Sequence, residues 1–249
     1  MLMTPVSPAP LTIASNHLLA RMRDLERPAC LPRLEPVVLE TAQVLYEPGE
    51  PLSHVYFPTS GMVALVAVMA DGRATETATI GREGAFGMSA SGYVDKAFTR
   101  YVVQIAGSGY RVTASDFEQM IDDSVGLCSA VARWRDVLLR MTLQSVACNA
   151  VHNVRQRCAR WILTTHDRTE NDLLPLTQEF LAEMLGVKRN AISLVARELQ
   201  SVGAIDYRRG RVTVVDRGRL QAISCECYPL IRDEIAKLVA DLPSSECDD

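Results

Sequence analysis

The chain has 249 residues, 48% of them hydrophobic, and a net charge of −4 at pH 7. No apolar run reaches the roughly 20 residues needed to cross a membrane, and the N-terminal stretch MLMTPVSPAPLTIASNH lacks the basic-then-apolar order of a signal peptide. We therefore expect a cytoplasmic protein with no membrane partner. Seven cysteines without paired spacing argue against a disulfide framework, and the acidic net charge by itself argues against a nucleic-acid binder.

Charge is divided unevenly along the chain. Between Asn153 and Leu220 there are 12 Lys and Arg residues against 8 Asp and Glu residues, a local net charge of +4 in a chain whose total is −4. A basic segment joined to an acidic remainder suggests a module that meets phosphate, attached to one that does something else.

The first half of the chain has the sequence pattern of a β-protein. The Pro-rich residues up to about Thr12 are expected to be loosely packed, and one or two short helices are expected between Ser15 and Leu31. Short β-rich runs then alternate with Gly, Pro and Asp turns and have no helical crossovers between them, which predicts a sandwich or small barrel. The expected strands are Pro36–Leu39, Gln43–Tyr46, His54–Pro58, Met62–Met69, Ala74–Ile80, Tyr101–Ala106 and Gly109–Thr113.

A long helix is expected next, because apolar or small residues recur at alternating steps of four and three. A second apolar side is formed by Val137, Leu139, Leu143 and Val146, so one side can face the barrel and the other a second copy of the chain. We favour a homodimer, with a hinge at Ala150–Asn153. The heptad seam, which we assign to the dimer helix, consists of Leu127, Val131, Trp134, Leu138, Met141, Ser145 and Cys148.

The stretch Leu176–Leu199, LTQEFLAEMLGVKRNAISLVAREL, predicts two short helices joined by a turn at Gly186. Thr177 is the expected N-cap of the first helix. The second helix has an apolar side and an opposite side of hydrogen-bonding residues, which a major-groove reader needs. An ordinary helical hairpin with a solvated face is the alternative. The apolar side holds Ile192, Val195 and Leu199, and the other side holds Asn190, Ser193, Leu194 and Arg197.

A hairpin with basic residues at its tip follows the two helices. Its expected strands, Ile205–Tyr207 and Val212–Val215, flank the tetrapeptide Arg208-Arg209-Gly210-Arg211. A solvated turn would account for one or two of these arginines, but three beside a helix-turn-helix favour phosphate contact. The remaining segment, Leu220–Leu242, is expected to be helical and to close the small domain.

This order of elements, together with the residue strings, resembles the CRP/FNR family of bacterial transcription regulators. The strings are VLYEPGEPLSHVYFPTSGMVALV, DGR and IGREGAFG in the first half, and VRQRCARWIL and LTQEFLAEMLGVKRNAISLVARELQSVGAI in the second. The resemblance implies an α+β fold with an N-terminal β-roll sensor domain (residues 15–123), a dimerisation helix and hinge (124–152) and a winged helix-turn-helix domain (153–242). It implies a homodimeric, sequence-specific regulator without enzymatic activity, whose partners are double-stranded DNA, RNA polymerase and a small-molecule effector.

By position, Arg189, Asn190, Ser193 and Leu194 fall where the family reads bases. Arg189 could pair bidentately with guanine and Asn190 with adenine, whereas Leu194 could either contact a thymine methyl or pack against the first helix. The best-known readers of the family carry Glu at the Asn190 position and Arg at the Leu194 position, so we expect a different half-site. The residues expected to contact phosphates are Thr177, Lys188, Arg197, Arg208, Arg209 and Arg211.

The resemblance gives less information about the effector. Cyclic-nucleotide readers of the family use a Gly-Glu pair for the ribose and a later Arg-Ser pair for the cyclic phosphate. Here the first pair aligns with Gly87-Met88, and the second falls near Phe98-Thr99. The missing carboxylate deprives a ribose hydroxyl of its acceptor, which argues against cyclic AMP. The candidate effector pocket consists of Gly87, Met88, Thr99, Arg100 and Thr142.

The cysteines and histidines argue against bound metal. The iron–sulfur members of the family cluster three cysteines near the N-terminus, where this chain has only Cys30, while Cys128 lies on the long helix. Haem has no support from the scattered histidines, which are His17, His54, His152 and His166. The Cys225-x-Cys227 pair could be a redox pair or half of a metal site. Because no second pair has metal-ligand spacing, we favour two helix-packing thiols.

Two other kinds of function are alternatives to DNA binding. A barrel enzyme of the cupin kind needs a cluster of histidines and carboxylates inside the barrel, and only His54 lies on a predicted strand. An effector-binding module that has lost DNA binding would have no reason to keep the basic hairpin.

Overall fold

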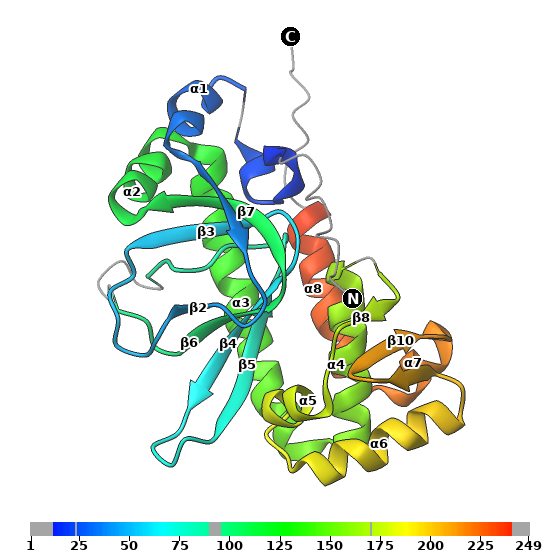
Figure 1. The fold of residues 1–249 in the computed structure, drawn as a ribbon. Coiled ribbons are helices and arrows are strands. Elements are labelled where there is room, and N and C mark those ends of the chain that lie inside the picture. Colours follow the sequence, from blue (N-terminus) through cyan, green and yellow to red (C-terminus); the bar gives the residue numbers. More distant parts are fainter. Residues whose placement is uncertain (1–11, 23, 90–95, 170, 241–249) are drawn as a thin grey trace, which may run out of the picture.

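The computed structural model describes residues 12–22, 24–89, 96–169 and 171–240. A β-rich body built from the first half of the chain lies on one side of the long helix α3, and a smaller helical unit with a β-hairpin lies below and beside it (Figure 1). The Pro-rich start of the chain lies outside the described residues, apart from Thr12. No helix among the described residues is long and apolar enough to cross a bilayer.

Short helical turns precede the strands. They are η1 (Ile13–Ser15), η2 (Leu19–Arg21), α1 (Arg27–Cys30) and η3 (Leu31–Arg33), where the sequence predicted one or two short helices. Leu18 and Leu19 are completely buried and join the core of the β-rich body. The segment therefore covers one end of that body.

Two antiparallel sheets form the β-roll, with strand orders β1-β7-β3 and β2-β6-β4-β5. Every expected strand is present, with bounds that differ from the prediction by at most two residues. The strands are β1 (Glu35–Leu39), β2 (Val44–Tyr46), β3 (His54–Pro58), β4 (Met62–Val68), β5 (Ala74–Ile80), β6 (Arg100–Ile105) and β7 (Gly107–Thr113). A helix, α2 (Ala114–Asp123), follows β7 and leads into α3.

The long helix α3 (Val125–Val151) buries its heptad seam inside its own chain. Trp134 is completely buried, donates a 2.8 Å hydrogen bond from Nε1 to the carbonyl of Ala85, and lies so close to Gly84 that a Cβ there would be 2.2 Å from its ring. The sequence left open which apolar side of this helix faces the barrel, and the structure packs the heptad seam against the protein's own β-roll and α8. The seam residues Leu127, Val131, Trp134, Met141 and Cys148 are buried, and Leu138 and Ser145 are half-buried.

The second apolar side of α3 remains open. Leu139, Leu143 and Val146 are 59%, 60% and 63% exposed, while Val137 is buried with the seam. Spacings of four and three residues place the three exposed side chains on one stripe of the helix. The heptad pattern was thus interpreted correctly as two-sided, but the side available to a partner is the one formed by these three residues.

The second half of the chain forms a winged helical unit. Its helices are α4 (Val154–Thr169), α5 (Gln178–Met184), α6 (Arg189–Ser201), α7 (Arg217–Ile223) and α8 (Cys227–Ala240), and its strands are β8 (Leu173–Leu174), β9 (Ile205–Arg208) and β10 (Arg211–Val214). The strands form a sheet of order β8-β10-β9. The sequence predicted the hairpin but not β8, which adds a third strand.

The expected helix Leu220–Leu242 is two helices, and its last two residues lie outside the described ones. Pro229 explains the break, because proline is tolerated in the first turn of a helix but not in its interior. The second helix, α8, contacts α4 through Tyr228, whose hydroxyl donates to Asp167 over 2.9 Å. Beyond that turn it packs along α3, and Ile231 and Leu238 join the core of the β-roll. The expectation that this segment closes the small domain therefore holds for the end of α7, where Leu220 joins the core of the winged unit, and for the first turn of α8.

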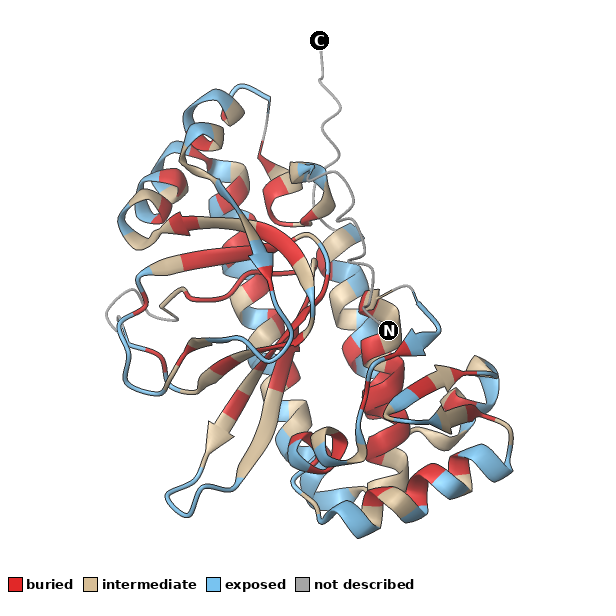
Figure 2. Ribbon diagram, viewed as in Figure 1, coloured by how far each residue is buried: buried red, intermediate tan, exposed pale blue. Residues whose placement is uncertain are grey.

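The winged unit packs directly onto the β-roll. Met62 of β4 shares an apolar cluster with Trp161 of α4 and Met184 of α5. At the edge of this contact, the half-buried Glu76 of β5 accepts a 2.8 Å hydrogen bond from Trp161 Nε1 and another from Gln104 Nε2. α4 lies at the centre of this arrangement and is buried along much of its length (Figure 2).

Candidate nucleic-acid interface

The two helices of the predicted helix-turn-helix are α5 and α6. Thr177 caps α5 as expected, since its Oγ1 accepts a 3.1 Å hydrogen bond from the Phe180 amide. Gly186 has a φ of +62°, a conformation that favours glycine, and it turns the chain toward α6. Lys188 is the N-cap residue of α6, and Arg189 is its first helical residue. The local sequence therefore fixes where the second helix begins.

The inner side of α6 holds the helix in place. Ile192 and Leu199 are completely buried, and Val195 is nearly so. These residues share an apolar cluster with Leu181 and Leu185 from α5 and the turn after it. Burial of this kind contributes about 1.5–3 kcal/mol for each large aliphatic side chain. The packing leaves the opposite side of α6 free to face outward.

The outer side of α6 carries the predicted base-reading residues. Arg189, Asn190 and Leu194 are exposed, and Ser193 is half-buried. Leu194 is 53% exposed, so its side chain does not pack against the first helix. The exposure favours the other interpretation, in which Leu194 is available to contact a thymine methyl group. Arg197, one turn further along, is also exposed, and its Nε donates to the carbonyl of Ser193 over 3.1 Å.

Two residues of α5 that the sequence did not single out contact the outer side of α6. Gln178 Oε1 accepts a 2.5 Å hydrogen bond from Ser193 Oγ, and the Glu179 carboxylate lies 2.9 Å from Arg189 Nε. The second contact joins two side chains that are 64% and 62% exposed, and such pairs contribute only about 0–1 kcal/mol. Arg189 can therefore exchange this carboxylate for another acceptor at low cost.

The hairpin between β9 and β10 is a tight two-residue turn. Arg208 pairs with Arg211 across the sheet, and the two residues between them, Arg209 and Gly210, both have positive φ, as a type I′ turn requires. A Cβ on Gly210 would lie 3.2 Å from Thr177 Cγ2, so the tip of the hairpin touches the start of α5.

The predicted phosphate contacts therefore come from adjoining elements. Thr177 and the hairpin arginines meet at one place, and Lys188 and Arg197 lie on α6. Arg208 pairs with Asp206 over 3.0 Å. Among the described residues, no ion pair involves Lys188, Arg209 or Arg211. The surface thus presents cations whose charge is not neutralised by a carboxylate of the protein.

The residues of the candidate effector pocket differ in what they contact. Arg100 forms an ion pair with Glu47, its Nη2 lying 3.0 Å from Oε1, so its charge is already balanced. Thr142 Oγ1 donates to the carbonyl of Leu138 over 2.9 Å, within its own helix. Gly87 has a φ of +83°, Met88 is half-buried, and the buried Thr99 Oγ1 has no hydrogen-bond partner.

Aromatic side chains fill the neighbouring part of the β-roll. Tyr56 stacks on Phe86 at 5.0 Å between ring centroids, and Tyr46 and Tyr101 pack edge to face at 5.7 Å. All four are at least 92% buried, and burial raises the pKa of Tyr101 to about 12. This interior therefore resembles a packed aromatic core more than a site for a charged ligand.

Comparison with known proteins gives two family matches that follow the division of the chain. Residues 36–124 match the cyclic nucleotide-binding domain, and residues 156–223 match the Crp-like helix-turn-helix domain. No curated protein sequence matches the chain.

Several solved structures share the fold. FixK2 from Bradyrhizobium japonicum is 17% identical, with a TM-score of 0.66, and the match covers 77% of this chain and 98% of that one. The global regulator CLP from Xanthomonas campestris, described as responsive to c-di-GMP, is 18% identical with a TM-score of 0.64, and the match covers 77% and 98% of the two chains. A CRP/FNR family regulator from Thermus thermophilus is 20% identical with a TM-score of 0.61, covering 76% and 98%.

Proposed function

Because the chain belongs to the CRP/FNR family of transcription regulators, we propose that it acts as a homodimer that inserts α6 of each copy into successive major grooves of a two-fold symmetric DNA site. It is a DNA-binding transcription regulator and not an enzyme. What we propose beyond this is the set of contacting residues, the dimer and the response to an effector. The observation that carries the proposal is the exposed polar side of α6, which begins beside the arginine-bearing tip of the β9–β10 hairpin.

Base reading is proposed for Arg189, Asn190 and Leu194. Arg189 can donate two hydrogen bonds to guanine O6 and N7, Asn190 can pair with adenine N6 and N7, and Leu194 can contact a thymine methyl group. Ser193 belongs to the same surface, although its hydroxyl is already bound to Gln178. A reader with this combination prefers a half-site that differs from those of family members with Glu and Arg at the Asn190 and Leu194 positions.

Phosphate contacts are proposed for the residues around this reading helix. Cations and hydroxyls at its borders fix the register of the protein on DNA without reading sequence. Each phosphate that they neutralise releases counterions, so the affinity falls as salt rises. The residues concerned are Thr177, Lys188, Arg197, Arg208, Arg209 and Arg211.

The exposed stripe of α3 supports the homodimer. Leu139, Leu143 and Val146 expose more than half of their side chains to solvent on one face of a helix of 27 residues. Pairing this stripe with its copy would bury apolar surface from both subunits and would relate the two α6 helices by a two-fold axis. A two-fold axis in the protein predicts a palindromic DNA site.

Control by an effector is proposed to act through the contact between the β-roll and the winged unit. Glu76 and Trp161 join β5 to α4 there, and α3 ends at Val151 while α4 begins at Val154, so the break between the two helices falls within the proposed hinge at Ala150–Asn153. The proposed division is a sensor at 15–123, a dimerisation helix and hinge at 124–152, and a DNA-binding unit at 153–242. An effector that binds one arrangement better shifts the population toward it. Chromosomal DNA and RNA polymerase are the proposed partners, which places the protein in the cytoplasm.

Selection from a random duplex library tests the proposal. The wild-type protein is expected to enrich a two-fold symmetric sequence. The logarithm of its binding constant for that sequence, plotted against the logarithm of the salt concentration, is expected to fall with a slope of about −0.9 for each phosphate neutralised. The double variant Arg189→Ala, Asn190→Ala is the matched control, and it should no longer enrich the same half-site. Selection that yields no common sequence, with or without nucleotide effectors present, would contradict the proposal.

A further inference from the structure

Three cysteines and one histidine meet where the long helix ends. Cys148 and His152 lie at the last turn of α3, Cys225 lies in the bend between α7 and α8, and Cys227 is the first residue of α8. Their four ligand atoms, which are three Sγ atoms and one imidazole nitrogen, all lie within 4.8 Å of one another. We call these four residues the hinge cluster. The sequence favoured two packing thiols for Cys225 and Cys227 because no second pair had metal-ligand spacing, and the fold brings Cys148 and His152 beside them as two further potential ligands.

Two of the spacings inside the hinge cluster match tetrahedral coordination. Cys148 Sγ lies 3.6 Å from Cys225 Sγ, and Cys227 Sγ lies 3.6 Å from His152 Nδ1. Zinc bonds of about 2.3 Å to sulfur and 2.0–2.1 Å to nitrogen, at tetrahedral angles, place two sulfurs about 3.8 Å apart and a sulfur and a nitrogen about 3.6 Å apart. These two spacings are therefore close to those of zinc ligands, and the other pairs of ligand atoms lie within 4.8 Å.

We propose that the hinge cluster binds one Zn²⁺ ion in a closed site of three cysteines and one histidine. The three cysteines are at most 2% exposed, as suits a structural site that keeps no position open for water. Thiolate and imidazole ligands in this ratio, with tetrahedral spacing, are typical of zinc rather than of magnesium or calcium, which prefer oxygen ligands.

Neighbouring side chains support the proposed ligands. The Glu226 carboxylate lies 3.1 Å from His152 Nε2, so that nitrogen can donate to the carboxylate while Nδ1 keeps its lone pair toward the cysteines. Gln144 Nε2 donates to Cys227 Sγ over 3.0 Å. A carboxylate behind a ligating histidine, and an amide donor to a thiolate, are contacts that orient metal ligands.

The charge around the cluster is favourable for a thiolate site. Zn²⁺ with three thiolates carries a net charge of −1, and the buried Arg157 and Arg160 of α4 interact electrostatically with Cys148. The Nε atoms of both arginines are buried without a hydrogen-bond partner. These guanidinium groups can therefore balance the charge of the occupied site.

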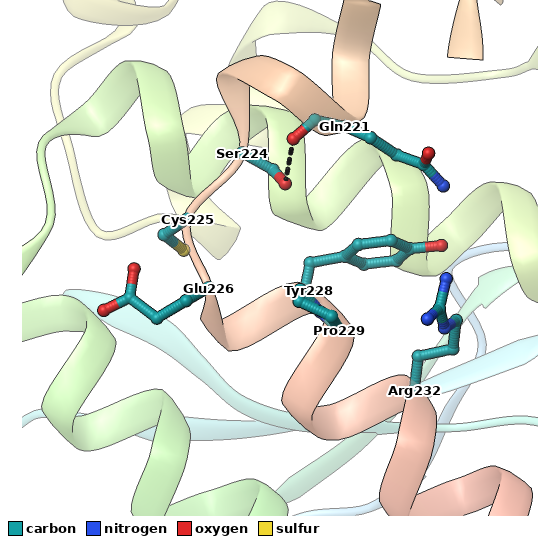
Figure 3. A pocket seen from close by; sticks show the side chains of 7 residues that line it. All are labelled: Gln221, Ser224, Cys225, Glu226, Tyr228, Pro229 and Arg232. Carbon is teal, nitrogen blue, oxygen red and sulfur yellow. Dashed lines mark hydrogen bonds between the residues drawn. The ribbon is translucent and has the colours of Figure 1, made fainter. Parts of the chain in front are cut away.

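A surface pocket lies beside the cluster. A cavity of about 280 Å³ lies between α7 and α8, and Cys225 and Glu226 are among its lining residues. Figure 3 shows these two side chains next to each other at one end of the cavity, with Tyr228 and Arg232 toward the other. The pocket therefore adjoins one of the four residues of the cluster.

A disulfide explains the cluster less well. The bond would need Cys148 Sγ and Cys225 Sγ about 2.05 Å apart instead of the observed 3.6 Å, and it would leave Cys227 and His152 without a role. Zinc uses all four groups. It also ties the end of α3 to the start of α8 on either side of the hinge, so the occupied site would limit how far the winged unit can rotate.

Metal analysis of the full-length protein purified under reducing conditions tests the proposal, and it does not depend on DNA binding. We expect one zinc per chain in the wild type and loss of that zinc in Cys225→Ser and Cys227→Ser. The controls are Cys128→Ser, at an exposed position of α3, and Cys30→Ala, in the core of the β-roll, and both should retain it. Zinc contents that are equal in all variants, or absent from the wild type, would overturn the proposal.

A further variant tests the site without changing a buried cysteine, in case the cysteine variants misfold. Glu226 is 70% exposed, so Glu226→Ala should fold normally while losing the support of His152. Removing such a partner typically weakens metal affinity by about 10–100-fold, measured here by competition with a chromophoric chelator. The metal-free wild type titrated with Co²⁺ should show the absorption of tetrahedral cobalt thiolate. An unchanged zinc affinity, no cobalt thiolate absorption, or a Cys148–Cys225 disulfide that persists in protein purified under reducing conditions would each refute the site.

Discussion

Breaking the buried ion pair between Arg168 and Glu83 should destabilise the contact between the two halves of the chain. Arg168 Nη2 of α4 lies 2.6 Å from Glu83 Oε1 of the β-roll, and both side chains are only 5% exposed. Burial alone would raise the pKa of Glu83, but the Arg168 charge and hydrogen bonds from Arg168 and the Gly81 amide hold it below 4.5. Arg168→Met leaves that carboxylate buried without a cation.

The expected cost follows from this geometry. Removing one partner of a buried ion pair lowers the free energy of unfolding by about 3–5 kcal/mol, because the remaining charge is uncompensated. Replacing both partners, as in Glu83→Leu with Arg168→Met, should recover most of that loss. Arg73→Met, which breaks an exposed pair with Asp71, is the matched control and should cost no more than about 1 kcal/mol.

Urea unfolding at fixed protein concentration measures these differences. The chain has two tryptophans, Trp134 under the β-roll and Trp161 at the contact itself, so fluorescence reports on both. Because the folded pKa of Glu83 is lowered, the pair's contribution is present above pH 4.5 and is lost as the pH falls through the folded pKa. The reasoning would be refuted if Arg168→Met lowered the free energy of unfolding as little as Arg73→Met does. It would also be refuted if the double variant lost as much free energy of unfolding as the two single variants together.

Three further predictions concern DNA reading, dimerisation and pH. Arg189→Ala should relax the preference for one base pair by about 1–3 kcal/mol, whereas Arg209→Ala should weaken binding to all sequences alike, as anisotropy titrations would show. Leu143→Glu should convert the dimer to monomer in sedimentation equilibrium, while Leu230→Glu on α8, also at an exposed leucine, should not. Burial raises the pKa of Glu76, so its contribution to stability is present below pH 4.5 and is lost as the pH rises through the folded pKa. Glu76→Gln should therefore raise the unfolding temperature at pH 7 and not at pH 4.5.

Each of these predictions has an outcome that contradicts it. Equal loss of sequence preference in the two arginine variants would remove the distinction between base and phosphate contacts. A Leu143→Glu protein that remains dimeric would show that the exposed stripe of α3 is not the contact between subunits. The same effect of Glu76→Gln on the unfolding temperature at both pH values would show that the carboxyl group titrates alike in the folded and unfolded states.

The elements that the sequence predicted best are specified by local residues. The strands of the β-roll are short β-rich runs separated by turns such as Gly49 and Gly72, whose φ values of +89° and +83° favour glycine. The helix-turn-helix has its own local signals in Thr177 and Gly186. Strand β8 was missed because Leu173–Leu174 is too short to show alternation.

The features that the sequence did not predict depend on residues far apart in the chain. The heptad pattern showed that α3 is apolar on two sides, but the close approach of Trp134 to Gly84 decides which side faces inward. The ion pair of Arg100 with Glu47 joins positions 53 residues apart, and Cys148 and Cys225 are separated by 77. The spacing of four between Cys148 and His152 on one helix was the local signal that could have suggested a metal site.

The spacing of the DNA half-sites tests the central claim most directly. Duplexes that carry two copies of the selected half-site, separated by one additional base pair at a time, are titrated with the wild-type protein in an electrophoretic assay. Two α6 helices related by the α3 dimer axis predict one optimum, with the half-site centres about one helical turn, or 10–10.5 base pairs, apart, and a steep loss of affinity on either side of it. An affinity that does not change with the separation would contradict a symmetric dimer reading successive major grooves.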